Sequence, residues 1–385
     1  MRTANRHQHK KGNGEGAIRH RSDGRWEARY YTTSGMRRTR HSIYGQTRQA
    51  VAKGLRECLA NTDTGFAPGQ GNISLAIYLS RWLDSIRQSV KPTTLEKYTR
   101  DVNHHIIPAV GHFRLDKLEP RHISMLYTDM IQSGLSPTTA LHVHEVLHRA
   151  LDQAQRWGLI YRNVAALVDR PRRNAFVIQP LSLAEARQFL EAAKQDRLHA
   201  LYVLAITAGL RQGELLALTW ENIDLSAGNI SVCGTLQHLA GAGYIVTPPK
   251  TKRSVRRVEL TQQALSALRA HKVSQSAERA VAGTVWENSA FVFTTAAGGP
   301  INAANLLHRS FFPLLARANL RRIRFHDLRH TAATLMLQGG VHPKIASEIL
   351  GHSSIAITLD LYSHVTPSIQ RQAIRVIDTM LWDPE

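Results

Sequence analysis

Two stretches that break the hydrophobic pattern constrain how this chain can fold. Residues 62–72 (TDTGFAPGQGN) are rich in glycine and proline and show no periodicity, which is typical of a linker. Residues 168–180 (VDRPRRNAFVIQP) combine two prolines with a basic run, and this combination interrupts helices. A chain of 385 residues is long enough for two or three domains. We therefore expect three domains, at residues 1–62, 73–170 and 178–385.

A large excess of positive charge narrows the classes of partner. The chain holds 49 lysines and arginines against 29 aspartates and glutamates, which gives a formal net charge of +20. Such an excess favours a polyanion. No stretch of about 18 apolar residues is present to span a bilayer, and no amphipathic helix with a wholly basic face is evident. We therefore expect a nucleic acid, and not a membrane, as the partner of this chain.

The N-terminus and the cysteines indicate an intracellular protein. Residues 1–11 carry charge, but no apolar region follows them, so they do not form a secretory signal. Cys58 and Cys233 are too few for a disulfide framework, and their apolar neighbours predict buried thiols. We expect a cytoplasmic location.

The first block predicts a small sheet followed by one helix. Residues 25–31 (RWEARYY) and 38–44 (RTRHSIY) are rich in aromatic and β-branched residues, and a turn is expected at 32–35 (TTSG). A helix is expected from an N-cap at Thr47. Its apolar stripe consists of Val51, Leu55, Cys58 and Leu59.

This block also carries about half of the net charge. A charged run is most often a solvated surface. Along these strands, however, arginines alternate with aromatic residues. The arginines are Arg25, Arg29, Arg38 and Arg40, and the aromatic residues are Trp26, Tyr30 and Tyr44. We expect a sheet face that contacts DNA phosphates or enters a groove.

The second block is helical, with helices expected near 74–88, 94–106, 119–132 and 137–157. Thr93 is the candidate N-cap of the second helix, with Glu96 at the capping-box spacing. Ser136 precedes a proline at the start of the fourth helix, and Gly158 ends it. Three basic residues near helix ends and loops are candidate DNA contacts, namely Lys91, Lys97 and Arg100. Each alone is an ordinary surface residue, and their value is collective.

The third block is mainly helical with a small β-rich region. Residues 182–185 (SLAE) form a capping box, and residues 199–207 predict a buried helix. Because that helix ends at Gly209 and a new one starts near Gln212, Arg211 lies at a turn that can direct its side chain into a cleft. Strand-like runs follow at 229–232, 244–246 and 255–260. We expect residues 248–253 (PPKTKR) to form a hairpin connection whose Lys252 and Arg253 reach DNA.

Basic residues of this block have the composition needed to hold a phosphodiester. Arg211 and Arg329 are candidates for a phosphate clamp, because a guanidinium donates two hydrogen bonds and stays charged. His326 and His352 are candidate donors or proton carriers.

A late tyrosine supplies the candidate nucleophile. Guanidinium groups near Tyr362 would favour its anionic form, and a histidine can accept its proton. The leaving 5′-oxygen needs a proton, and a lysine of the expected hairpin, Lys250 first and Lys252 second, can supply it.

Simpler structural interpretations exist for each residue. Arg211 beside Glu214 fits a structural ion pair, and a lone Tyr362 fits a packed aromatic. His326 and His330 lie at i and i+4, which resembles a metal-binding helix motif. Because Arg329 within that motif would repel a cation and no third ligand is evident, we expect no metal.

The order and spacing of these residues resemble a known family. Residues 207–215 (TAGLRQGEL), 326–330 (HDLRH) and 350–353 (LGHS), followed by Tyr362, closely resemble the motifs of the tyrosine recombinases, the lambda-type phage integrase family. The resemblance covers about residues 73–385. The positions that match the active site of the family are Arg211, Lys250, His326, Arg329, His352 and, as the nucleophile, Tyr362. Glu214 and His330 match supporting positions.

The resemblance implies a multidomain α+β fold. Residues 1–62 would form an arm-type DNA-binding domain with a small sheet plus a helix, residues 73–170 a helical SAM-like core-binding domain, and residues 178–385 a mainly helical catalytic domain with a small sheet or hairpin. It also implies a site-specific recombinase that cuts and rejoins DNA through a 3′-phosphotyrosine and integrates or excises a phage or mobile element. Neither ATP, metal nor another cofactor is implied.

Implied partners are double-stranded DNA at core and arm-type sites, and further copies of this chain in a homotetramer on two duplexes. A host DNA-bending protein and an excision factor are further candidates, and the implied location is the bacterial nucleoid. An apolar stripe near the C-terminus can dock on its own domain or on a neighbour, and consists of Ile369, Ala373, Val376, Ile377 and Met380. Two alternatives stay open, a catalytically silent DNA-binding regulator and a type IB topoisomerase-like enzyme that nicks and recloses one duplex.

Overall fold

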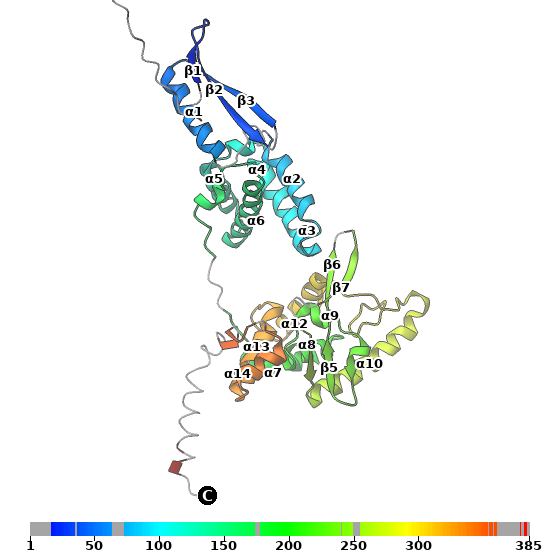
Figure 1. Ribbon diagram of the computed structural model, residues 1–385. Helices are drawn as coiled ribbons and strands as arrows, with labels where there is room; N and C mark the ends of the chain where they lie inside the picture. Colours follow the sequence, from blue (N-terminus) through cyan, green and yellow to red (C-terminus); the bar gives the residue numbers. More distant parts are fainter. Residues whose placement is uncertain are drawn as a thin grey trace, which may run out of the picture. The chain divides into compact units, whose positions relative to one another are not determined.

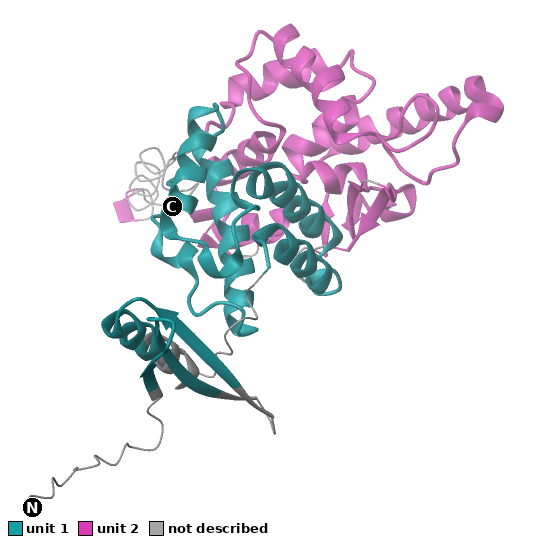
Figure 2. Ribbon diagram, turned by 90° about the horizontal axis from the view of Figure 1, so that it is seen from above, with its two compact units in different colours: residues 1–175 teal, residues 176–385 magenta. Residues whose placement is uncertain are grey.

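A computed structural model gives the architecture of the chain (Figure 1). It describes residues 17–34, 37–63, 73–173, 178–239, 241–248, 255–352, 354–356, 358, 359, 378, 381 and 382, with the main chain only at 17, 32–34, 37–39 and 57–63. The chain forms two compact units, residues 1–175 and 176–385 (Figure 2). The division between them falls inside the second predicted seam at 168–180. The three-domain division stays a prediction.

The described part of the first unit starts with a three-stranded antiparallel sheet of order β1-β2-β3, formed by β1 (Ala17–His20), β2 (Trp26–Ser34) and β3 (Arg37–Gly45). One face of the sheet packs on α1 (Arg48–Asp63), and the buried residues of this contact are Ala28, Tyr30, Val51 and Leu55. The prediction of a sheet packed on one helix is therefore confirmed. The predicted turn at 32–35 is wrong, because residues 32–34 continue β2 and pair with residues 37–39 of β3.

The remainder of the first unit is a helical bundle. Its α-helices are α2 (Leu75–Ile86), α3 (Pro92–Asp101), α4 (Ile107–Val110), α5 (Pro120–Gln132) and α6 (Pro137–Arg156). A π-helical turn (Val102–Ile106) joins α3 to α4, and 3-10 turns lie at Leu115–Lys117 and Val164–Leu167. Trp82, Ile106 and Leu147 are among the fully buried residues of its core. The four predicted helical segments are confirmed, although the second is composite.

Helix starts follow two different rules in this bundle. The Ser136 hydroxyl accepts from the Thr139 amide at 3.1 Å, so the predicted cap of α6 is confirmed. The predicted capping box at Thr93 is wrong, because α3 begins at Pro92 with Lys91 as a cap that makes no side-chain hydrogen bond. Proline at the first helical position already has the helical φ and lacks an amide that would need a cap.

The described part of the second unit combines helices with two short sheets (Figure 1). Its α-helices are α7 (Leu183–Ala193), α8 (His199–Thr207), α9 (Gln212–Leu216), α10 (Gln262–Ala282), α11 (Ala303–Leu306), α12 (Phe312–Arg317), α13 (Phe325–Gln338) and α14 (Pro343–Leu350). Shorter turns lie at Trp220–Asn222, Gly283–Val285 and Leu307–Phe311. One sheet has the order β4-β5-β8, formed by Ile223–Asp224, Asn229–Val232 and Arg256–Glu259. The buried helix α8 and the Ser182 capping box are confirmed.

The second sheet corrects the predicted hairpin. Strand β7 (Gly243–Thr247) pairs with β6 (Thr235–Leu239), whereas β8 pairs with β5 in the other sheet. The strands β7 and β8 are therefore not the two arms of one hairpin, and the chain between them leads from one sheet to the other. The sequence missed β6 because TLQHL contains few β-branched residues. Lys250, Lys252 and Arg253 lie outside the described residues.

Within the described part of the chain, every helix is too short or too polar to cross a membrane.

Candidate active site

The first candidate clamp residue stands at the start of a helix. Arg211 is the N-cap of α9, and its amide donates to Glu214 Oε2 at 3.0 Å. Its Nη1 lies 2.6 Å from Glu214 Oε1, and its Nη2 donates to the carbonyl of Gly351 at 3.0 Å. The structural ion pair with Glu214 is therefore present, yet Arg211 also contacts the segment that precedes His352. One guanidinium joins two motifs that lie 140 positions apart.

The second candidate clamp residue is almost fully buried. Arg329 lies on α13 and is 2% exposed, and its Nη1 donates to the carbonyl of Gly209 at 2.7 Å. Its Nη2 is buried and has no hydrogen-bond partner among the residues that the structure describes. Burial, followed by the positive charge of Arg211, lowers the pKa of Arg329 to about 9. A buried guanidinium with an unsatisfied donor favours an anionic ligand.

A glycine allows the segments that carry these two arginines to pack closely. Gly209 has a φ of +62°, which L residues rarely adopt. A side chain there would collide with Leu350 and approach Ala332. The turn between α8 and α9 consequently packs against α13 and α14, and the Gly209 carbonyl faces Arg329.

Two histidines complete the cluster. His352 is buried, and its Nδ1 lies 2.8 Å from the Thr358 hydroxyl. Burial and then the charges of Arg329 and Arg211 lower the pKa of His352 to about 3. His326 keeps an exposed surface, and partial desolvation together with the charges of His330, Arg329 and Arg211 lowers its pKa to about 4. Both imidazoles are therefore neutral at neutral pH in the DNA-free protein.

The supporting residue His330 packs beside His326. It is buried, and the two rings meet edge to face with centroids 4.8 Å apart. Burial lowers the pKa of His330 as well. Because arginines 211 and 329 lie among these groups, the cluster repels cations and suits an anion.

One further buried charge belongs to this cluster, and the sequence did not single it out. Arg256 lies on β8, and its guanidinium contacts Glu214 with Nη2 to Oε2 at 3.0 Å. In the structure Arg256 lies on the same face of β8 as Val258, which is buried two residues later. The adjacent Arg257 faces the other way and is exposed.

The structure thus brings together the predicted residues Arg211, Glu214, His326, Arg329, His330 and His352. Lys250 and the predicted nucleophile Tyr362 lie outside the described residues, as do all five residues of the C-terminal apolar stripe.

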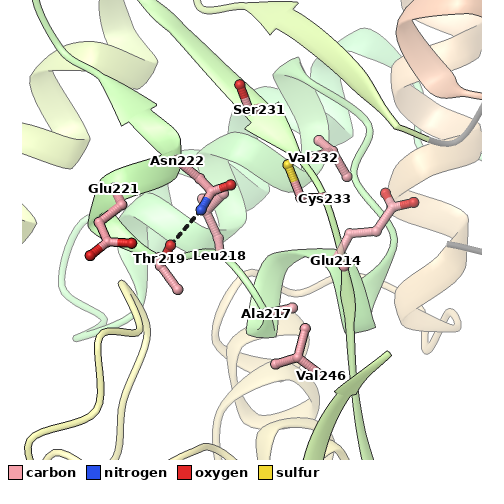
Figure 3. A pocket seen from close by; sticks show the side chains of 11 residues that line it. Glu214, Ala217, Leu218, Thr219, Glu221, Asn222, Ser231, Val232, Cys233 and Val246 are labelled. Carbon is pink, nitrogen blue, oxygen red and sulfur yellow. Dashed lines mark hydrogen bonds between the residues drawn. The ribbon is translucent and has the colours of Figure 1, made fainter. Parts of the chain in front are cut away.

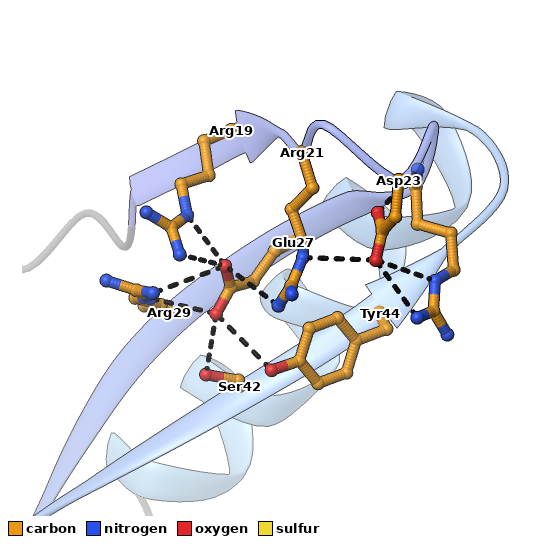
Figure 4. Close-up of polar contacts among 8 residues, drawn as sticks. Arg19, Arg21, Asp23, Glu27, Arg29, Ser42 and Tyr44 are labelled. Carbon is orange, nitrogen blue, oxygen red and sulfur yellow. Dashed lines mark hydrogen bonds and ion pairs between the residues drawn. The ribbon is translucent and has the colours of Figure 1, made fainter.

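The predicted DNA-binding face of the first sheet is only partly as expected. Trp26 and Tyr30 pack toward α1, because neighbouring residues of a strand point to opposite faces. The arginine face centres on Glu27, which is 1% exposed and has Arg29 Nε at 2.9 Å and Arg19 Nη2 at 2.6 Å (Figure 4). Hydrogen bonds from Arg29 above all, then from Arg19 and Ser42, lower the pKa of Glu27 to about 2.

The remaining residues that were predicted to contact DNA from the first sheet lie around this carboxylate or outside the described residues. Tyr44 points toward Glu27, with 3.5 Å between its hydroxyl and Oε1 (Figure 4). Arg25 pairs with Asp23 at 3.0 Å, and Arg40 is exposed opposite Tyr31. The side chain of Arg38 lies outside the described residues.

The candidate DNA contacts of the helical bundle gather on α3. Lys91 is exposed at its start, and Arg100 is exposed in its last turn, 3.5 Å from Asp101. The expected position of Lys97 near a helix end is wrong, because it lies half-buried in the middle of α3.

The prediction of a buried Cys233 is also wrong. Its thiol is exposed, because Cys233 follows the buried Val232 at the end of β5 and points to the opposite side. It lines a pocket of about 330 Å³ together with Asn222 and Glu214 (Figure 3). The side chain of Cys58 lies outside the described residues.

Comparisons with known proteins identify the family of this chain. The phage integrase family matches residues 179–368, and the N-terminal SAM-like domain of phage integrases matches residues 74–131. A tyrosine recombinase XerC-like protein of Caldanaerobacter subterraneus subsp. tengcongensis is 30% identical over 89% of this chain and 92% of its own length.

Two solved structures show the same fold. The integrase of the transposon Tn1549, bound to a circular intermediate DNA, has a TM-score of 0.66 and 22% identity over 79% of this chain and 99% of that chain. A lambda integrase tetramer bound to a Holliday junction has a TM-score of 0.55 and 19% identity over 88% of this chain and 95% of that chain.

Fold and site together define an enzyme of DNA strand exchange. The chain belongs to the phage integrase family of tyrosine recombinases, and it is a site-specific DNA recombinase.

Proposed function

We propose that this recombinase cuts and rejoins DNA through a 3′-phosphotyrosine formed by Tyr362. The observation that carries the proposal is the pair Arg211 and Arg329. The two guanidiniums are held by main-chain carbonyls of opposite segments, and Arg329 keeps a buried donor without a partner in the described structure. A scissile phosphate is an anion whose oxygens can accept hydrogen bonds from these two guanidiniums.

The chemical step follows from these residues. The phenolic oxygen of Tyr362 forms a bond to phosphorus, and the bond from phosphorus to the 5′-oxygen breaks. The phenolic proton passes to a neutral imidazole, for which His352 and His326 are the candidates. The leaving 5′-oxygen takes a proton from Lys250. A 5′-hydroxyl of the partner duplex then attacks the phosphotyrosine, which restores both groups, so the bond energy is retained and no cofactor is consumed.

We further propose a division of labour along the chain. Residues 1–62 bind arm-type sites through the Glu27-centred sheet face, residues 73–170 bind the core site with Lys91, Lys97 and Arg100, and residues 178–385 perform the chemistry. Lys252 and Arg253 add DNA contacts beside Lys250.

The likeness to a DNA-bound transposon integrase supports a mobile element as the substrate. The lambda integrase tetramer on a Holliday junction supports a homotetramer acting on two duplexes. A host DNA-bending protein and an excision factor complete the proposed assembly, which would act on the bacterial nucleoid.

Replacement of either clamp residue tests the catalytic part of this proposal. Arg211→Ala and Arg329→Ala each remove a charged donor from the transition state, so each should slow cleavage of a core site by at least about 10²-fold. The dissociation constant for the same DNA should change little. Cleavage is measured at saturating DNA with a substrate whose nick prevents religation, and thermal unfolding checks that each variant is folded. Cleavage at the wild-type rate by either folded variant would remove that arginine from the active site.

A further inference from the structure

Arg256 is a buried cation at the junction of three separate segments. Its side chain is 6% exposed. Nη2 lies 3.0 Å from Glu214 Oε2 and Nη1 lies 3.3 Å from Oε1, so the guanidinium grips the carboxylate with two nitrogens. Its Nε donates to the carbonyl of Ile349 at 2.7 Å. Arg256 therefore ties β8 both to α9 and to the end of α14.

Glu214 is shared between two arginines. It is buried, and burial acts to raise its pKa, yet the hydrogen bonds and charges of Arg256 first, and of Arg211 next, hold that pKa below its usual value. The carboxylate stays ionised and has an arginine on either side. Removal of one arginine leaves the whole carboxylate charge to the other.

Gly351 brings Arg256 close to the Arg211 contact. A Cβ at Gly351 would lie 2.9 Å from Nη1 and 3.0 Å from Cδ of Arg256, so only a glycine leaves room for this guanidinium. The carbonyl of the same glycine accepts the hydrogen bond from Arg211 Nη2. Gly351 therefore constrains the side chains of both Arg256 and Arg211.

These contacts determine how many N–H donors of Arg211 the carboxylate of Glu214 engages. With Arg256 present, Arg211 gives Nη1 to one oxygen of Glu214, while Arg256 engages both oxygens. Without Arg256, the buried carboxylate would draw further N–H groups of Arg211, and fewer would face a phosphate.

We propose that Arg256 is a positioning residue that, through Glu214, keeps the Arg211 guanidinium available to the scissile phosphate. The proposal rests on the proposed function and deepens it. Arg256 does not itself touch DNA in this role.

Three variants test the proposal in the full-length chain. Arg256→Gln removes the charge, Arg256→Lys keeps it without the planar fork, and Arg257→Gln is the control. Arg257 lies on the same strand with a side chain 61% exposed, 3.6 Å from Glu259. At saturating core DNA, Arg256→Gln should cleave at least about tenfold more slowly, as expected for loss of an outer partner that orients a reactive group. Arg256→Lys should recover part of the loss, and Arg257→Gln should match the wild type.

A second substrate separates positioning from a general structural defect. Replacement of one non-bridging oxygen of the scissile phosphate by a methyl group removes the charge that Arg211 neutralises. If Arg256 acts through Arg211, the ratio of wild-type to Arg256→Gln rates should shrink on this neutral DNA. An equal defect on both substrates, or no defect on either, would overturn the proposal.

Three outcomes of these experiments are distinguished. If Arg256→Gln fails to fold, Arg256→Lys is compared on the same pair of substrates and the same ratio decides. If the wild-type protein forms no covalent adduct, the proposed function itself fails. An active wild type with an unimpaired Arg256→Gln variant would contradict this inference alone.

Discussion

Three charged side chains of the candidate active site are buried. Arg329, Glu214 and Arg256 are each less than a tenth exposed, although an isolated buried charge costs several kcal/mol. Motif order in the sequence pointed to Arg211, Glu214 and Arg329. It did not point to Arg256, because two adjacent arginines on a strand look alike until the pairing of β8 with β5 determines which of them faces inward.

Two histidines of the candidate active site should make the free energy of unfolding depend on pH. An unfolded histidine has a pKa of 6.5, whereas His326 and His352 have pKa values of about 4 and about 3 in the folded chain. The unfolded state therefore binds protons first, and the free energy of unfolding should fall as pH drops from about 6.5 toward about 4. Hydrogen exchange of the buried α13 amides measures it.

A matched variant identifies the source of that slope. His352→Gln should flatten it by up to one proton, which is about 1.4 kcal/mol per pH unit. The measurement should stay above about pH 5, where carboxylates do not yet titrate. An unchanged slope in His352→Gln would show that this imidazole is not held neutral by the fold.

Among the elements, the strands were the hardest to predict from the sequence. The alternation of arginine and aromatic residues in the first sheet was visible, but it places Trp26 and Tyr30 on the face opposite Arg29, whereas Tyr44 lies on the arginine face. Trp26 and Tyr30 belong to the core, while Arg19 and Arg21, which were not predicted, join Arg29 around Glu27 (Figure 4). A local pattern could not show this, because Arg19 belongs to a four-residue strand recognisable only by its pairing with β2.

Glu27→Gln tests whether this carboxylate organises the arginine face. Ordering a long side chain costs about 0.5–1.5 kcal/mol on binding, so releasing Arg19 and Arg29 should weaken binding to an attachment-site arm by about five- to 150-fold. Binding to random DNA should hold or rise, because the variant loses a negative charge. Asp23→Asn is the control, since it removes an equal charge from the neighbouring turn. The carboxylate of Asp23 pairs mainly with Arg25. Parallel changes in specific and random binding, in both variants, would show a charge effect only.

At the scale of the whole molecule, the sequence predicted the order of the elements better than it predicted which strands pair. The helical bundle, the buried α8 and the motif residues of the second unit were predictable, because long amphipathic helices and specific spacings are local signals. The pairing of β6 with β7, and hence the role of residues 248–253 as a link between two sheets, was not predictable. Strand partners are chosen by contacts between distant segments, and β6 has no strong propensity of its own.

The covalent intermediate is the most direct test of the whole account. Full-length protein and Tyr362→Phe are incubated with a nicked core-site duplex, and denaturing gels and peptide mass spectrometry follow the DNA-linked protein. The account predicts an adduct on the peptide that contains Tyr362 in the wild type. It predicts none in Tyr362→Phe, with an unchanged dissociation constant for the duplex. An adduct that persists in Tyr362→Phe, or one that maps to another residue, would contradict it.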